Sequence, residues 1–280
     1  KEILFKENYF NIINGYKQLF LKPNDDEKYL DGCTFDEIYA LYKFDRALRK
    51  LFLDKILIVE NNIKSVLSHY FASQYTENKY LKLSNLSRRD HDCIKDSTRF
   101  IASVHSDIAD KAKRHSAISH YITNHGYVPP WVLVNILTFG RISMWISVLK
   151  DIDKENVARS FKINATQLGT FTKFLALARN ICAHDERLYC SKFNIIADTK
   201  YHTSLNLLTN VHGDFIRGKR DCMALLITLK FFIGDSEYKN LVDAVWGELF
   251  TLKSSLKTIN LNQVLSKMGF PKKWHKIRDL

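Results

Sequence analysis

An arginine, an asparagine, a histidine and a second arginine lie close together in the segment ARNICAHDERL, as Arg179, Asn180, His184 and Arg187. An imidazole can move a proton near neutral pH, and a guanidinium can hold a phosphate through two parallel hydrogen bonds. These groups suit the cleavage of an RNA phosphodiester, because the 2′-hydroxyl of RNA supplies the nucleophile. We therefore expect this chemistry to need no metal ion and no cofactor.

The order of these residues determines which of them can meet. If the segment forms the end of a helix, Asn180 and His184 share a face, and Arg187 follows on the same side. Arg179 precedes His184 by five residues, which separates their Cβ directions by about 140° on an ideal helix. The two side chains converge within one chain only if the arginine wraps round or the helix is distorted.

The spacing of arginine and histidine alone is not specific. Arg99 with His105, and Arg114 with His120, also match the pattern Arg-x(4–6)-His, and we interpret those pairs as parts of solvated helix faces. The segment at Arg179 differs because it follows a strongly apolar run and places an asparagine where a helix interior would gain nothing from one.

The composition favours a globular protein with affinity for polyanions. The chain has 280 residues, 46% of them hydrophobic, and 42 Lys+Arg against 30 Asp+Glu give a net charge of +12. The five cysteines are odd in number and form no C-x-x-C pair, which indicates a reducing compartment, the cytoplasm. No apolar stretch reaches the roughly 18 residues of a membrane span. The chain begins at Lys1 without the features of a signal peptide, which is compatible with a trimmed N-terminus.

Proline and glycine are scarce, at 4 and 10 residues, so long helices and an all-α fold are expected. No linker-like segment divides the chain, and we predict one helical domain over 1–280 with a basic tail at about 253–280. A capping box of Thr34 and Glu37 is expected to start the first long helix. The predicted helices are 34–71, 87–112 before a loop ending at 124–126, a central helix 131–149, 165–188, 219–233 and 235–256. Residues 189–203 are also compatible with short β elements.

Two groups of basic residues are candidate RNA contacts. Arg46, Arg49 and Lys50 lie on the first long helix, and the tail carries Lys272 and Lys273 among seven cations that face one acid. Trp274 either stacks on a base or anchors the tail to the domain. Arg187 either binds phosphate or pairs with a carboxylate one turn away, and a merely solvated surface is the alternative for the remaining cations.

The segment RNICAHDERL resembles the RN-x-x-A-H-x-x-RL signature of the Abi-like abortive-infection family of bacterial phage defence (AbiD/AbiF type), which is placed among the HEPN ribonucleases. Three further blocks resemble the family in the same order: FDRALRKLFLDKILIVENNIKSVL, PPWVLVNILTFGRIS and MGFPKKW. The resemblance therefore covers most of the chain.

The resemblance implies an all-α HEPN-type helical bundle with additional helices, and a metal-independent endoribonuclease toxin. It makes His184 the catalytic acid or base, Arg179 the phosphate stabiliser and Asn180 their polar companion, in a composite site formed by a homodimer. Pairing of two protomers would also remove the difficulty of the 140° offset. The arginine and the histidine at one phosphate could then come from different chains related by a two-fold axis. Restraint by a structured non-coding RNA is a further implication.

Two other functions fit the same residues. The basic surface could grip a structured RNA in a defence system without cleaving it, and a helical DNA-binding or scaffolding protein is a weaker alternative. Other enzyme classes lack their motifs, since no P-loop, dinucleotide fingerprint, H-E-x-x-H or G-x-S-x-G is present. His115, His120 and His125 recur at five-residue steps, which does not align them as metal ligands.

Overall fold

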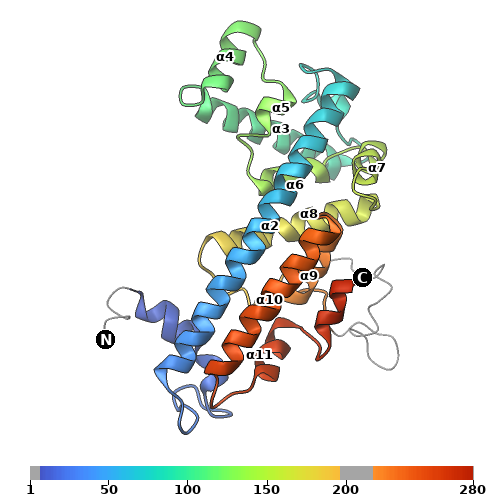
Figure 1. Ribbon diagram of the computed structural model, residues 1–280. Coiled ribbons are helices and arrows are strands. Elements are labelled where there is room, and N and C mark those ends of the chain that lie inside the picture. The colour runs from blue at the N-terminus through green and yellow to red at the C-terminus, as the bar shows by residue number, and fades with distance from the viewer. Residues whose placement is uncertain (1–6, 196–216, 280) are drawn as a thin grey trace. The chain divides into compact units, whose positions relative to one another are not determined.

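The computed structural model describes residues 7–195 and 217–279, and the regular elements of this part of the chain are helices, with one isolated β-bridge between Leu21 and Tyr29. The all-α prediction is confirmed. The helices are η1 (Phe10–Asn14), η2 (Lys17–Phe20), α2 (Phe35–Tyr75), η3 (Leu83–Asn85), α3 (His91–Lys111), α4 (Ser116–His125), α5 (Pro130–Leu133), α6 (Phe139–Ser147), α7 (Asp151–Arg159), α8 (Ala165–Ala183), α9 (Cys222–Lys230), α10 (Asp235–Ser255), α11 (Leu261–Met268) and η5 (Trp274–Asp279) (Figure 1). No helix among them is both long and apolar enough to cross a membrane.

The chain divides into two compact units. The first comprises residues 1–56 and 178–280, and the second comprises residues 57–177. Both crossings between them run through helices, since α2 contains the first boundary and α8 the second. A boundary inside a helix needs no proline- or glycine-rich linker, so the sequence carries no sign of it. The single-domain organisation stays a prediction.

Helix α2 begins at Phe35, directly after the threonine that the sequence identifies as its start. Glu37, which the sequence assigns to a capping box, binds a distant segment of the chain. Its carboxylate accepts hydrogen bonds from the backbone N–H groups of Lys257 and Thr258 and from the Thr258 hydroxyl. Burial opposes ionisation of Glu37, but the hydrogen bonds from this segment outweigh it and lower the pKa of the carboxyl. The first turn of α2 therefore holds the connection between α10 and α11.

The first unit is built around the apolar stripe of α2 and the closing helices. Helix α9 is buried from Cys222 to Leu229, and α10 runs alongside the first half of α2 in Figure 1. Asp221 caps α9 by accepting from the Ala224 N–H at 3.0 Å. A Cβ on Gly269 would come within 2.1 Å of the Asp221 carboxylate, and Gly269 has a φ of +79°, so this position requires glycine.

The second unit packs around Trp145 of α6. The rings of Phe71, Tyr80 and Phe100 lie 5.0, 5.8 and 5.7 Å from the Trp145 ring. Such contacts between aromatic rings stabilise a core beyond the effect of buried area. The centre of this unit is thus aromatic.

Two predicted segments differ from the structure. The expected central helix 131–149 is split into α5 and α6, because Thr138 caps α6 by accepting from the Arg141 N–H at 3.2 Å. The expected loop before Gly126 contains α4, which Gly126 ends with a φ of +73°. Both differences arise from capping residues. Thr138 starts a new helix inside an apolar run that suggested one continuous helix, and Gly126 ends a helix in a segment whose apolar residues suggested none.

The remaining predictions fit more closely. The closing pair 219–233 and 235–256 corresponds to α9 and α10, and Gly234 precedes α10 as its N-cap residue. The predicted helix 165–188 ends earlier, at Ala183. Residues 189–195 contain no strand, and residues 196–203 of the segment considered for β structure lie outside the described residues.

Candidate functional site

His184 directly follows the last residue of α8. Its backbone N–H donates to the Asn180 carbonyl at 2.9 Å, which closes the final turn of the helix. The next residue, Asp185, has a φ of +59°, and this left-handed conformation turns the chain away from the helix axis. Asn180 and His184 are both exposed. The helix therefore presents the motif at its C-terminal end, where solvent reaches the imidazole.

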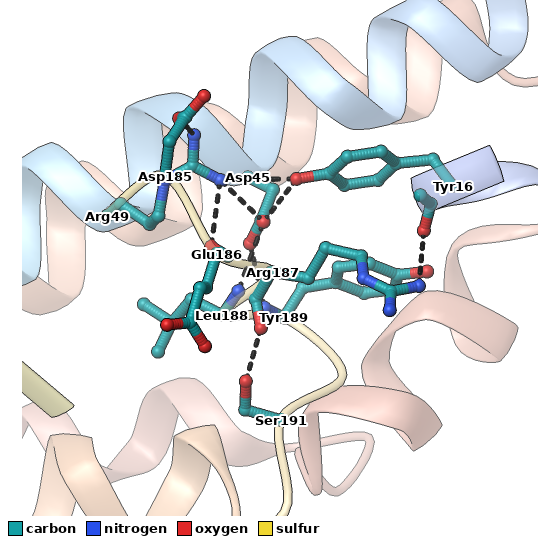
Figure 2. A network of polar contacts seen from close by, with 10 residues as sticks. Tyr16, Asp45, Arg49, Asp185, Glu186, Arg187, Leu188, Tyr189 and Ser191 are labelled. Carbon is teal, nitrogen blue, oxygen red and sulfur yellow. Dashed lines mark hydrogen bonds and ion pairs between the residues drawn. The ribbon is translucent and has the colours of Figure 1, made fainter. Parts of the chain in front are cut away.

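Asp45 of α2 holds the segment that follows His184. Its carboxylate is fully buried and accepts hydrogen bonds from the backbone N–H groups of Leu188 and Tyr189 at 3.1 and 2.7 Å. It also accepts from the Tyr16 hydroxyl at 2.7 Å and pairs with Arg49 at 3.0 Å. Figure 2 shows these groups converging on the one carboxylate. We call Tyr16, Asp45 and Arg49 the motif anchor.

Arg49 extends the motif anchor to the turn itself. Its guanidinium donates to the Tyr16 hydroxyl and to the Glu186 carbonyl, each at 3.1 Å, and forms an ion pair with the Asp185 carboxylate. Burial raises the pKa of Asp45, and the hydrogen bond from Tyr16 and the charge of Arg49 act in the opposite direction. Burial, with the charge of Asp45, raises the pKa of the Tyr16 hydroxyl well above its usual range. Tyr16 therefore remains a hydrogen-bond donor to the carboxylate.

A cavity of about 510 Å³ opens beside the motif. The motif contributes His184 and Arg187 to its lining, the segment after the motif contributes Ser191, and η1 contributes Phe10, Asn11 and Asn14. Protein cavities that hold small ligands have volumes of about 300–1,000 Å³. The exposed imidazole therefore borders a space large enough for part of a substrate.

Arg187 joins the two walls of this cavity. Its guanidinium donates to the Gly15 carbonyl at 2.7 Å, just beyond the end of η1, and its own carbonyl accepts from the Ser191 hydroxyl. The side chain remains exposed, and a guanidinium has five N–H donors. Arg187 can thus hold η1 beside the motif while part of its fork faces the cavity.

Arg179 lies on the last full turn of α8 and is half-buried. It is not among the residues that line the cavity beside His184. The structure thus brings His184 together with Arg187, whereas the sequence pairs His184 with Arg179. Both motif arginines remain candidates for phosphate binding, at different places.

The model of the Abi-like protein family matches residues 2–190 of this sequence. The chain belongs to this family. Family membership associates this Abi-like protein with abortive infection, a form of defence against phage. The matched region includes α2, α8 and the whole of the motif, whereas α9, α10 and α11 lie beyond it. No curated protein and no solved structure shows significant similarity to the chain.

The other predicted RNA contacts of the Abi-like protein divide into exposed and buried residues. Arg46 and Lys50 are exposed on α2, with Arg46 placed 3.6 Å from the Glu7 carboxylate, and Lys272 and Lys273 are exposed before η5. These four positions are accessible to a polyanion.

Arg49 and Trp274 do not suit the contacts that the sequence assigns to them. Arg49 is 3% exposed and its guanidinium binds Tyr16 and Asp45, so we give it a structural role in the motif anchor. Trp274 is 0% exposed, and its ring packs 4.7 Å from Phe270. A buried indole cannot stack on a base, so anchoring of the tail is the role that fits Trp274.

Sequence reasoning missed Asp45, Tyr16 and the residues of η1 in the Abi-like protein. Asp45 precedes Arg49 by four residues, a spacing at which opposite charges pair on a helix. A carboxylate in that position, on the apolar stripe of α2, was the available signal for a buried network. Among the described residues no group of three or more His, Cys, Asp or Glu side chains is placed to hold a metal ion.

Proposed function

We propose that this Abi-like protein is a metal-independent endoribonuclease of the HEPN type, close to the AbiD/AbiF group, that acts as a toxin in phage defence. The observation that carries the proposal is the position of His184, exposed at the end of α8 and bordering the cavity that Arg187 also lines. The family match that contains the motif supports the connection with defence.

In the proposed reaction the 2′-oxygen of a ribose attacks the adjacent phosphorus and the bond to the 5′-oxygen breaks. His184 moves the proton that this exchange requires, and Arg187 and Arg179 stabilise the charge that develops on the phosphate oxygens. Asn180 lies on the same turn as His184 and orients it or the substrate. The products are a 2′,3′-cyclic phosphate and a 5′-hydroxyl.

Replacing the 2′-hydroxyl by hydrogen at the cleaved position tests this reaction. We expect the purified protein to cleave RNA in EDTA and to leave 2′,3′-cyclic phosphate ends. An oligonucleotide with deoxyribose at that position should remain intact, because it lacks the nucleophile. Product ends can be identified by mass spectrometry. Specific binding of RNA without cleavage of either substrate would instead support a non-catalytic RNA-binding module.

We also propose that two protomers share each site, since Arg179 does not line the cavity that His184 borders. A two-fold axis would place the arginine of one protomer beside the histidine of its partner. RNA would approach over the exposed cations Arg46, Lys50, Lys272 and Lys273, and the net charge of +12 favours that approach.

Mixing two inactive variants tests the shared site. Arg179→Ala and His184→Ala protomers, once their subunits have exchanged, form heterodimers in which one of two sites keeps both residues. When the two variants are mixed in equal amounts, half of the dimers are mixed and one of the two sites in each is intact, so cleavage should recover to about a quarter of the wild-type rate. No recovery, with heterodimers detected by native mass spectrometry, would contradict a site made from one arginine and one histidine of different chains.

Restraint of the toxin by a structured non-coding RNA, and a cytoplasmic location, complete the proposal. The restraint follows from the resemblance to the Abi-like family, and the location follows from the five cysteines, which form no C-x-x-C pair.

A further inference from the structure

The wall of the cavity that faces the motif is formed by η1 and carries side chains that the catalytic proposal does not use. Phe10 is 67% exposed, although aromatic side chains of this size are usually mostly buried. Asn11 and Asn14 are exposed beside it, and all three line the cavity. η1 is a π-helix, a rare form that often occurs at functional sites.

The position of this wall relative to His184 is fixed by hydrogen bonds. The Arg187 guanidinium binds the Gly15 carbonyl next to η1, and the Tyr16 hydroxyl binds Asp45 of the motif anchor. Because Asp45 also binds the backbone of Leu188 and Tyr189, both walls are attached to one buried carboxylate. The C-terminal end of η1, which carries Asn14, is therefore attached to the segment that follows His184.

The charges around the cavity indicate which part of a nucleotide it would accept. Asp185 and Glu186 line it together with Arg187, and the Asp185 carboxylate is paired with Arg49. The lining thus carries the acidic Glu186 as well as the basic Arg187, and the Glu186 carboxylate would repel a phosphate beside it but tolerate an uncharged heteroaromatic ring. An exposed phenyl ring offers a stacking surface for any base, and carboxamides form paired hydrogen bonds with base edges.

We propose that this cavity is a nucleobase subsite, in which Phe10 stacks on the base next to the cleaved linkage and Asn11 and Asn14 bind its edge. The inference rests on the proposed ribonuclease function, because it places the base by reference to His184. It makes η1 the element that selects which RNA sequence is cleaved.

Four chimeric substrates test the subsite. Each is a DNA oligonucleotide with a single ribonucleotide, A, C, G or U, so that only one linkage has a 2′-hydroxyl. We expect kcat/KM to differ among the four bases by about 10-fold or more, and the Asn11→Ala/Asn14→Ala variant to reduce that difference to less than about 3-fold. Phe10→Ala should lower kcat/KM by about 10-fold on the preferred base. The matched control is Tyr9→Ala, since Tyr9 is also an exposed aromatic residue, at 55%, but does not line the cavity.

A binding measurement separates failure of the subsite from failure of the catalytic proposal. Fluorescence anisotropy with labelled RNA pentamers of each base and the His184→Ala variant needs no cleavage. If base-dependent binding is lost with Phe10→Ala while the wild type cleaves nothing, the subsite stands and the ribonuclease proposal fails. If the wild type cleaves RNA but the Phe10 and asparagine variants match the Tyr9 control in both rate and binding, the subsite is refuted and the ribonuclease proposal stands.

Discussion

Replacing Asp45 with alanine lowers the free energy of unfolding by about 3–5 kcal/mol, the range found when one partner of a buried ion pair is removed. Arg49 is 3% exposed, and without Asp45 its charge would lose a fully buried carboxylate partner and keep the half-exposed Asp185. The backbone N–H groups of Leu188 and Tyr189 and the Tyr16 hydroxyl would lose their acceptor as well. Each buried donor left without a partner adds about 1–3 kcal/mol to the cost, although these effects overlap.

Urea denaturation followed by circular dichroism measures this change, and Asp243→Ala is the matched control. Asp243 also pairs with an arginine, Arg278, at 2.7 Å, but the two side chains are 52% and 40% exposed. Exposed ion pairs contribute about 0–1 kcal/mol. A loss of stability in Asp45→Ala no greater than in Asp243→Ala would show that the motif anchor does not hold the fold of the first unit.

Local sequence signals predicted the elements that depend on nearby residues. The apolar residues of α2 recur every three or four positions, and the helix begins beside Thr34 as its capping signal indicates. Gly234 separates α9 from α10 as expected. The motif lies at the end of α8 and exposes His184, because a short polar segment after an apolar helix has no apolar face to bury.

Features that depend on distant residues could not be predicted in this way. Asp45 meets Tyr16 and Tyr189, which lie 29 and 144 residues away, and no local pattern encodes such a contact. The same network explains why Arg49 is buried, although arginine is usually a surface residue. It also holds the turn at Asp185, so α8 ends before the predicted limit of 188.

The boundary between the two units was hidden for a related reason. Local composition marks linkers, but α2 and α8 pass through the boundary as continuous helices. Contacts between residues far apart in the chain define the units. The sequence alone therefore favours one domain.

His184→Ala is expected to reduce RNA cleavage by about 10²–10⁴-fold, the usual contribution of a positioned general acid or base. The side chain is exposed, so its removal should leave the fold intact, and circular dichroism can verify that. His120→Ala is the matched control. His120 also follows an arginine at a similar spacing and is exposed, but it lies on α4 in the second unit and bonds Asn124.

The most direct test of the catalytic role of His184 is therefore the single-turnover rate of RNA cleavage in EDTA for the wild type and these two histidine variants. If His184 is catalytic, the wild type and His120→Ala cleave RNA at equal rates, and His184→Ala loses nearly all cleavage. Cleavage by His184→Ala at the wild-type rate would contradict the catalytic role of His184.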